Sequence, residues 1–193
     1  MKKNGFVFVI SGPSGSGKTT LRDRLVQDPA MRKIFKKSVS MTTRPRRSQE
    51  RNLRDYQFIS SDEFRRLRKE KKLLEWTRYL GYYYATPKAS VESNLNQGKH
   101  MLLCLDLKGA QRIKKLYPRN SVTIFVKPPT LQTLKLRIMK RCSKIKQEEV
   151  ARRLALAKEE MKACNTFDHC VLNKSLQQAV VRLKSIVVKQ VKS

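Results

Sequence analysis

The sequence predicts an α/β fold in which a parallel sheet is flanked by helices. Short apolar runs alternate along the chain with longer segments of helical periodicity, and no internal repeat or low-complexity linker stands out. A continuous apolar run is typical of a parallel strand that is buried on both faces. Strands that alternate with helices indicate parallel crossover connections. The 193 residues suffice for one domain with a single core.

Each expected element has its own signal in the sequence. Four apolar runs are the candidate strands of the main sheet, at 6–10, 100–106, 121–126 and 168–172. Shorter strands are expected near 37–44 and 56–60, and a hairpin over 73–87. Ser60, three residues before Glu63, predicts a helix start, and Thr130 after two prolines predicts another. We expect helices at 19–28, 61–72, 88–98, 109–118, 131–141, 147–163 and 176–191.

The first apolar run leads into a glycine-rich loop, GPSGSGKT, at 12–19. The loop matches the phosphate-binding motif GxxxxGK[ST] in full, and it lies between an expected strand and an expected helix. Glycines allow successive backbone N–H groups to turn toward a phosphate, and the helix start adds partial positive charge. We expect Lys18 to bridge the β- and γ-phosphates of ATP or GTP and the Thr19 hydroxyl to bind Mg²⁺. The expected nucleotide-binding residues are Gly12, Pro13, Ser14, Gly15, Ser16, Gly17, Lys18, Thr19 and Thr20.

A second group of candidate binding residues lies in the arginine loop, residues 44–54. Five arginines fall within these eleven residues: Arg44, Arg46, Arg47, Arg51 and Arg54. In a phosphate-binding protein such guanidinium groups suit an anionic second substrate, although a solvated basic loop would have the same composition. Further on, Glu75 stands in the apolar segment LLEWTRY. One interpretation is that this carboxylate faces water. The other is that it accepts hydrogen bonds from the adjacent N1–H and N2 amino groups of guanine, a pair of donors that adenine lacks.

Taken together, these motifs resemble those of guanylate kinases. Five segments occur in the order and approximate spacing of that family, and together they extend over nearly the whole chain. They are SGPSGSGKTT, SVSMTTRPRR…E…DYQF, EW…G.YY, LDLKGAQ and PPTLQTLKLRI. The resemblance implies transfer of the γ-phosphate of ATP to GMP, which gives ADP and GDP. It also implies one domain with a P-loop core (1–37, 98–140 and 165–193), a small GMP-binding subdomain (38–97) and a lid (141–164).

The same resemblance implies roles for individual residues. The GMP phosphate would contact Arg44, Arg47, Tyr56 and Tyr84, and guanine would contact Ser40, Glu75 and Thr86. Asp106 matches the second acid of a pair beside GMP and the metal-bound phosphates, and Asn173 matches an asparagine near adenine. The arginines that would enclose the transferring phosphoryl group are Arg137, Arg141 and Arg153. A general base is not required, because the attacking phosphate oxygen of GMP is already ionised at neutral pH.

Four positions depart from the family pattern. Pro45 is shifted by one within the arginine motif, and Gln49 stands where a glycine is usual. Cys142 replaces a glycine of the lid. Most consequential, Cys104 stands in place of the first acid of the pair, which leaves Asp106 as the one carboxylate there.

Two alternatives remain open from the sequence. A guanylate-kinase-like interaction domain that binds peptides usually has a degraded glycine loop, whereas this loop is intact. A related P-loop kinase with another phosphorylated acceptor would not be expected to combine Ser40, Glu75 and Thr86.

The remaining composition indicates a soluble, cytoplasmic protein. The N-terminal apolar run is too short for a signal peptide, and no run approaches the length of a membrane span. The spacing of the cysteines, including the segment CNTFDHC at 164–170, fits no common zinc site, so we expect unpaired thiols in a reducing compartment. His100 and His169 lie outside the motifs and are expected to be structural.

The chain is strongly basic, with 44 Lys and Arg against 15 Asp and Glu and a net charge of +29. The basic runs are spread along the chain and hold few aromatic residues, which favours a solvated surface over a nucleic-acid site. Weak nucleic-acid binding could accompany catalysis. This alternative predicts that the protein is retained on immobilised RNA or DNA at low salt and released at moderate salt. Sequence-selective binding that resists salt would contradict the interpretation of the basic charge as mainly a solvated surface.

Overall fold

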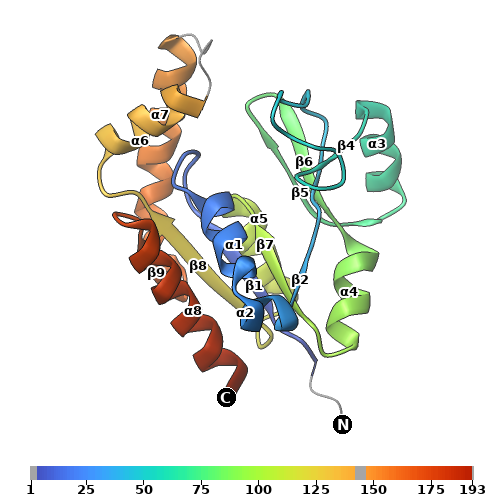
Figure 1. Ribbon diagram of the computed structural model, residues 1–193. Helices are drawn as coiled ribbons and strands as arrows, with labels where there is room; N and C mark the ends of the chain where they lie inside the picture. The colour runs from blue at the N-terminus through green and yellow to red at the C-terminus, as the bar shows by residue number, and fades with distance from the viewer. Residues whose placement is uncertain (1–3, 142–146, 193) are drawn as a thin grey trace.

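The computed structural model describes residues 4–141 and 147–192 (Figure 1). Its main sheet has five parallel strands in the order β2-β7-β1-β8-β9. These strands are β1 (Val7–Ser11), β2 (Phe35–Lys37), β7 (His100–Cys104), β8 (Ser121–Lys127) and β9 (His169–Leu172). The predicted parallel α/β fold and its four main strands are thus confirmed.

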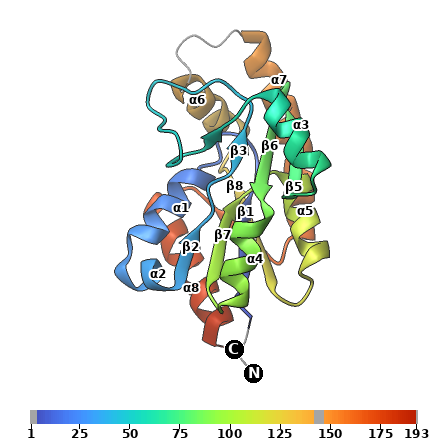
Figure 2. The same cartoon turned by 90° about the vertical axis from the view of Figure 1, so that its right-hand side faces the viewer.

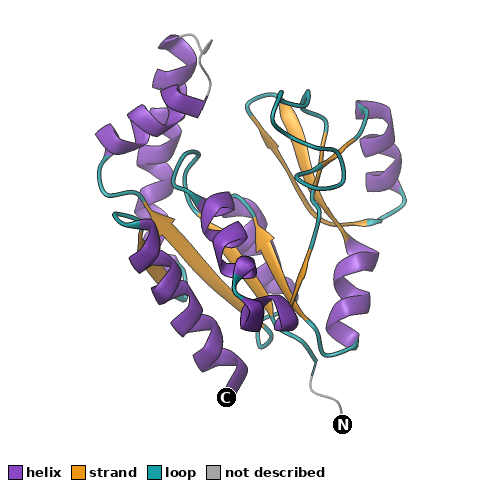
Figure 3. Ribbon diagram, in the orientation of Figure 1, coloured by secondary structure: helices purple, strands orange, loops and turns teal. Residues whose placement is uncertain are grey.

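Helices cover both faces of this sheet (Figure 3). One face packs against α1 (Lys18–Gln27), α2 (Pro29–Ile34) and α8 (Leu176–Lys192), and the other against α4 (Lys88–Asn96) and α5 (Leu107–Leu116). Successive side chains of a strand point to opposite faces. In β1, Phe8 and Ile10 therefore enter the first core, while Val7 and Val9 enter the second, and all four are fully buried. Burial on both faces explains why this strand is a continuous apolar run.

A second, smaller sheet has the order β4-β3-β6-β5. Its strands are β3 (Met41–Thr42), β4 (Gln57–Phe58), β5 (Leu73–Tyr79) and β6 (Tyr82–Pro87), and the last two form the predicted antiparallel hairpin. Helix α3 (Ser61–Lys69) covers it by packing Phe64 and Leu67 against Met41 and Ala85. Figure 2 shows this layer beside the upper end of the main sheet.

On the other side of the glycine-rich loop lie α6 (Leu131–Arg141) and α7 (Gln147–Lys162), followed by the short 3-10 helix η1 (Ala163–Thr166) (Figure 1). Leu134 and Ile138 of α6 pack against Val150 and Ala157 of α7. The hydroxyl of Thr130 accepts a hydrogen bond of 3.0 Å from the backbone N–H of Thr133, as predicted for the start of α6. The departure at Cys142 lies outside the described residues.

Helix α2 and strand β2 were not among the elements predicted from the sequence. Asp28 caps α2, since its carboxylate accepts from the N–H groups of Ala30 and Met31, and Pro29 occupies the first turn. The expected helix over 19–28 therefore ends at Gln27, and the chain turns before it adds an edge strand to the sheet.

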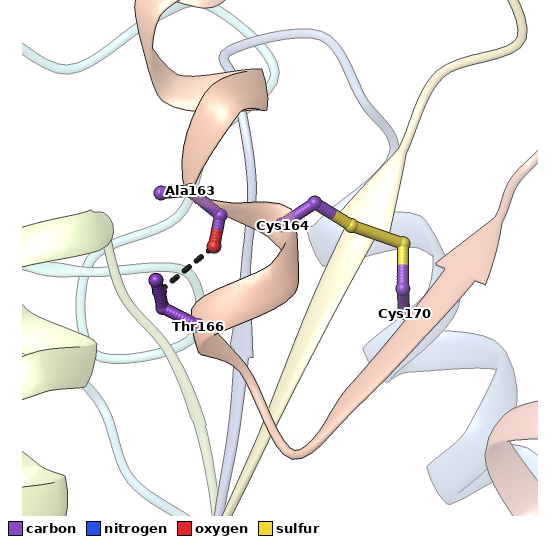
Figure 4. The surroundings of a disulfide bond; sticks show 4 residues. All are labelled: Ala163, Cys164, Thr166 and Cys170. Carbon is purple, nitrogen blue, oxygen red and sulfur yellow. Dashed lines mark hydrogen bonds between the residues drawn. A yellow bond between two sulfur atoms is a disulfide. The ribbon is translucent and has the colours of Figure 1, made fainter.

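The cysteines near the C-terminal strand differ from expectation. Cys164 of η1 and Cys170 of β9 are joined by a disulfide (Figure 4). The 3-10 turn, in which the Thr166 hydroxyl donates to the Ala163 carbonyl over 2.8 Å, folds the chain back. It brings the two Cα atoms to 6.3 Å, a separation that a disulfide can span. The expectation of unpaired thiols is thus wrong for this pair, while Cys104 is outside any disulfide.

Within residues 4–141 and 147–192, no helix is both long enough and apolar enough to cross a bilayer.

The cap of α3 provides a test of the local fold. The Ser60 hydroxyl accepts a hydrogen bond of 3.0 Å from the N–H of Glu63. Replacing Ser60 by alanine removes this acceptor, so we expect the free energy of unfolding to fall by about 1 kcal/mol in urea denaturation. Ser61→Ala, which alters the next and equally exposed position, is the matched control and should change stability much less. Equal effects of the two substitutions would contradict the capping role.

Candidate active site

A cavity of about 1170 Å³ lies among the glycine-rich loop, the second sheet and helices α6 and α7. The predicted site residues that line it are Gly12, Ser14, Gly15, Gly17, Lys18, Thr19, Thr20, Ser40, Arg44, Arg47, Tyr56, Glu75, Tyr84, Asp106, Arg137, Arg153 and Asn173. Pro13, Ser16 and Thr86 are not lining residues. Arg141 is the last residue of α6, and its side chain lies outside the described part of the structure. Residues from distant parts of the sequence thus meet in one cavity.

The glycine-rich loop follows β1 and precedes α1. Gly12, Gly15 and Gly17 have φ values of 135°, 86° and 99°, which side-chain-bearing residues rarely adopt. The Lys18 ammonium donates to the carbonyls of Gly12 and Pro13, over 2.5 and 2.9 Å, and so lies across the loop. No side chain caps α1 at Gly17, which leaves the partial positive charge of the helix start for an anion.

Asn173, at the end of β9, holds this loop against the sheet. Its buried amide donates to the Ser16 carbonyl over 2.7 Å, and a Cβ atom on Gly17 would lie 2.3 Å from the same amide nitrogen. Arg137 in turn donates to the Asn173 carbonyl over 3.1 Å. The other terminal nitrogen of Arg137, Nη1, is buried and has no hydrogen-bond partner in the described part of the chain. A buried guanidinium nitrogen that lacks a hydrogen-bond partner suits an anionic ligand.

Glu50 orients the arginines on the opposite side of the cavity. Its carboxylate accepts two bonds from Arg44, of 2.8 and 2.9 Å, and a third from the Arg47 N–H, of 2.9 Å. Although burial opposes it, these bonds hold the pKa of Glu50 below its usual value. The Arg44 guanidinium also lies 5.7 Å from the centre of the Tyr56 ring. Of the five arginines in the arginine loop, Arg44, Arg46 and Arg47 line the cavity, whereas Arg54 forms an exposed ion pair with Asp55.

Glu75 of β5 is a buried carboxylate that lines the same cavity as Arg44 and Arg47. It accepts a hydrogen bond of 2.5 Å from the hydroxyl of Thr86, on the paired strand β6. Burial raises the pKa of Glu75 to about 7; the Thr86 bond opposes this rise, and the charge of Asp106 adds to it. A Cβ atom on Gly109 would lie 2.8 Å from Glu75 Oε2, so α5 approaches this carboxylate by its backbone.

Cys104 ends β7 at the carboxyl end of the main sheet, and Asp106 follows it. Asp106 caps α5 by accepting from the Gly109 N–H over 2.8 Å. The Cys104 thiol donates to the Lys18 carbonyl over 3.8 Å and lines the cavity. At this position, where the sequence resemblance implied a carboxylate, a thiol thus contacts the start of α1.

Comparison with known proteins places these features in a family. The model of the guanylate kinase family matches residues 5–190. A guanylate kinase of Lactobacillus johnsonii is 41% identical over 187 residues, which cover 97% of this chain and 90% of that protein. The chain belongs to the guanylate kinase family. A guanylate kinase of Thermotoga maritima is also 41% identical, over 95% of this chain and 86% of its own length.

The fold agrees with a solved member of this family. The crystal structure of guanylate kinase from Anaplasma phagocytophilum matches with a TM-score of 0.82 at 26% identity, over 100% of this chain and 89% of that one. The α/β fold and the enzyme class predicted from the sequence are therefore confirmed.

Three residues at this guanylate kinase cavity were not predicted from the sequence. Glu50 holds the lining residues Arg44 and Arg47, a role that depends on the folded loop. Tyr79 of β5 and Glu160 of α7 line the cavity itself. Glu160 stands in a helix rich in charged residues, where no local signal distinguishes an inward carboxylate from a solvated one.

The buried carboxylate of Glu75 generates a pH test. Because its pKa of about 7 exceeds that of an unfolded glutamate, its bound proton stabilises the fold at pH 5, and this contribution is lost as the pH rises through 7. We expect Glu75→Gln, which is neutral at every pH, to reduce the drop in unfolding free energy between pH 5 and 8 by about 2 kcal/mol.

Urea denaturation at the two pH values measures this difference. Glu159→Gln, at an exposed carboxylate paired with Lys162, is the control and should leave the pH dependence unchanged. If Glu75→Gln behaves in the same way, the burial of an ionisable carboxylate at this position is refuted.

Proposed function

We propose that this guanylate kinase binds ATP on the glycine-rich loop and GMP against the second sheet, and transfers the γ-phosphate between them. The observation that carries the proposal is the placement of a phosphate-binding loop and a buried Glu75–Thr86 pair on facing sides of one cavity. Because the cavity exceeds the roughly 300–1,000 Å³ of common ligand pockets, it offers room for two nucleotides.

Recognition of the acceptor base is assigned to Glu75, with Ser40 and Thr86. The Thr86 hydroxyl fixes one carboxylate oxygen, Oε1, and so orients the other toward neighbouring donors. Guanine offers two adjacent N–H donors to such a carboxylate. Adenine offers no such pair and would leave a buried carboxylate poorly bonded, which is the costly case in a desolvated site.

Binding of the acceptor phosphate is assigned to Arg44, Arg47, Tyr56 and Tyr84. The bonds from Glu50 fix the direction of Arg44 before any substrate arrives. A preoriented guanidinium loses less side-chain entropy when it binds a phosphate, and it can bind two phosphate oxygens at once.

On the donor side, residues Gly12 to Thr20 are proposed to hold the phosphates of ATP, and Asn173 is proposed to lie near adenine. Within the described ranges, no three His, Cys, Asp or Glu side chains group as ligands of a metal ion. The Thr19 hydroxyl, at the start of α1 and on the cavity wall, is the proposed protein ligand of Mg²⁺ that arrives with the nucleotide. When bound, Mg²⁺ would neutralise phosphate charge.

The transfer itself requires alignment more than covalent help. An ionised phosphate oxygen of GMP forms the new bond to the γ-phosphorus as the bond to the β-phosphate oxygen of ADP breaks. Lys18, Arg137, Arg141 and Arg153 are proposed to stabilise the charge on the transferred group. Arg153 forms an ion pair with Glu149 of the same helix, so it must exchange this partner to reach the phosphoryl group.

The division of the chain follows from these assignments. We place the core at 1–37, 98–140 and 165–193, the GMP-binding subdomain at 38–97 and the lid at 141–164. The second sheet falls within the proposed subdomain. Since nucleotide recycling supplies both substrates in the cytoplasm, we also propose that the protein acts there.

An ADP-release assay with GMP, dGMP, AMP and UMP as acceptors tests the function. We expect turnover with GMP and little with AMP or UMP. Glu75→Gln should raise the KM for GMP by about tenfold or more, because one bond to a charged group contributes about 1.5–3 kcal/mol. The KM for ATP should stay within about twofold, well below a free-energy change of 1 kcal/mol.

The same assay identifies failure. No ADP release with any acceptor would refute the kinase function, and an equal rise in both KM values would refute the role of Glu75.

A further inference from the structure

Two buried polar atoms of the cavity are unexplained by the roles assigned above. Tyr79 Oη and Glu160 Oε2 are both inaccessible to solvent and have no partner in full hydrogen-bond geometry within the part of the chain that the structure describes, although the Ser14 hydroxyl lies beside the phenol. Tyr79 ends strand β5 of the second sheet, whereas Glu160 lies near the C-terminal end of α7. Both residues line the same cavity, Tyr79 from the second sheet and Glu160 from α7.

The two side chains lie within electrostatic reach of each other. Burial raises the pKa of Tyr79 to about 12, and the negative charge of Glu160 adds to this rise. The Ser14 hydroxyl, in the glycine-rich loop, also lies beside Tyr79 and favours its ionised form. Tyr79 therefore stands where the loop, the second sheet and α7 meet.

Glu160 also faces the centre of the proposed transfer site. Burial raises its pKa to about 7, the positive charge of Lys18 opposes this rise, and the negative charge of Asp106 adds to it. Glu160 is thus a second carboxylate near Lys18, within electrostatic reach of Asp106. It is placed to act on the ammonium group that is proposed to hold the γ-phosphate.

The two unbonded atoms are chemically complementary. A phenol donates one hydrogen bond, and a carboxylate accepts it in a charge-assisted bond. Each buried polar atom without a partner costs about 1–3 kcal/mol, so an adjustment that joins these two is favourable. The phenol oxygen can at the same time accept from the Ser14 hydroxyl.

We propose that Tyr79 and Glu160 form a hydrogen bond in the substrate-loaded enzyme, and that this pair positions Lys18 for phosphoryl transfer. The bond links the second sheet, which is proposed to hold GMP, to helix α7 and, through Ser14, to the glycine-rich loop. Both are positioning residues, because they act through Lys18 and the loop without touching the reacting phosphates. The inference rests on the proposed ATP-to-GMP transfer.

A double-mutant cycle tests the pair. Tyr79→Phe removes the donor and keeps the ring, and Glu160→Ala removes the acceptor. Since about 1.4 kcal/mol of lost stabilisation corresponds to a tenfold change, we expect each single variant to lower kcat by about tenfold. The KM values for ATP and GMP should stay within about twofold, because binding of either nucleotide does not require the pair.

The double variant distinguishes a pair from two separate effects. If the residues act together, the kcat of the double variant should lie within about twofold of the kcat of Glu160→Ala. Independent effects would instead multiply and lower kcat about a hundredfold relative to the wild type. Glu160→Gln keeps an acceptor for Tyr79 but loses the charge facing Lys18, so it should recover part of the lost kcat. Should Glu160→Ala fail to fold, Glu160→Leu, which also removes the acceptor but fills more of the space, completes the cycle with Tyr79→Phe.

Matched controls separate this role from general damage. Glu159→Gln alters the adjacent, exposed carboxylate of α7, and Tyr117→Phe removes a phenol hydroxyl that lies outside the cavity. Neither should change kcat, and all variants should melt close to the wild type. Multiplying effects in the double variant, or unchanged kcat in both singles, would overturn the proposal. Absence of GMP-dependent turnover in the wild type would instead refute the underlying function.

Discussion

The hydrogen bond from the Asn173 amide to the Ser16 carbonyl is the contact on which the site depends. It joins the glycine-rich loop to the end of β9 on the main sheet. The Asn173 carbonyl accepts from Arg137, so α6 takes its direction from the same residue. Because Gly17 presents no side chain to this amide, the loop can approach it closely. Loop, sheet and helix are therefore fixed together before any nucleotide binds.

Acidic residues do much of the positioning in this very basic chain. With 44 Lys and Arg against 15 Asp and Glu, positive charge is plentiful, but long flexible side chains have many orientations. Glu50 fixes Arg44, Asp106 caps α5, and Glu149 holds Arg153. The few carboxylates thus convert a general basic character into guanidinium groups with defined directions. Substituting these acids should disturb binding as much as substituting the arginines themselves.

The parts predicted from the sequence were those specified by local patterns. The glycine-rich loop, the 73–87 hairpin and the helix starts at Ser60 and Thr130 each depend on neighbouring residues. The approach of Tyr79 to Glu160 depends on how distant segments pack. The disulfide between Cys164 and Cys170 depends instead on the 3-10 turn between them. Helix α2 and strand β2 are too short for a periodic signal. Long-range packing and short, irregular turns therefore account for what the sequence left undetermined.

Gly109 gives the proposed base pocket an unusual wall. Since a Cβ atom there would lie 2.8 Å from Glu75 Oε2, this side of the carboxylate faces the backbone of α5 at Gly109. A mutation at a neighbouring side chain can be absorbed by a change of rotamer, but the backbone of a packed helix has no such freedom. A change in specificity toward another acceptor base would require a displacement of α5 itself. The base specificity of this site is therefore expected to change slowly in evolution.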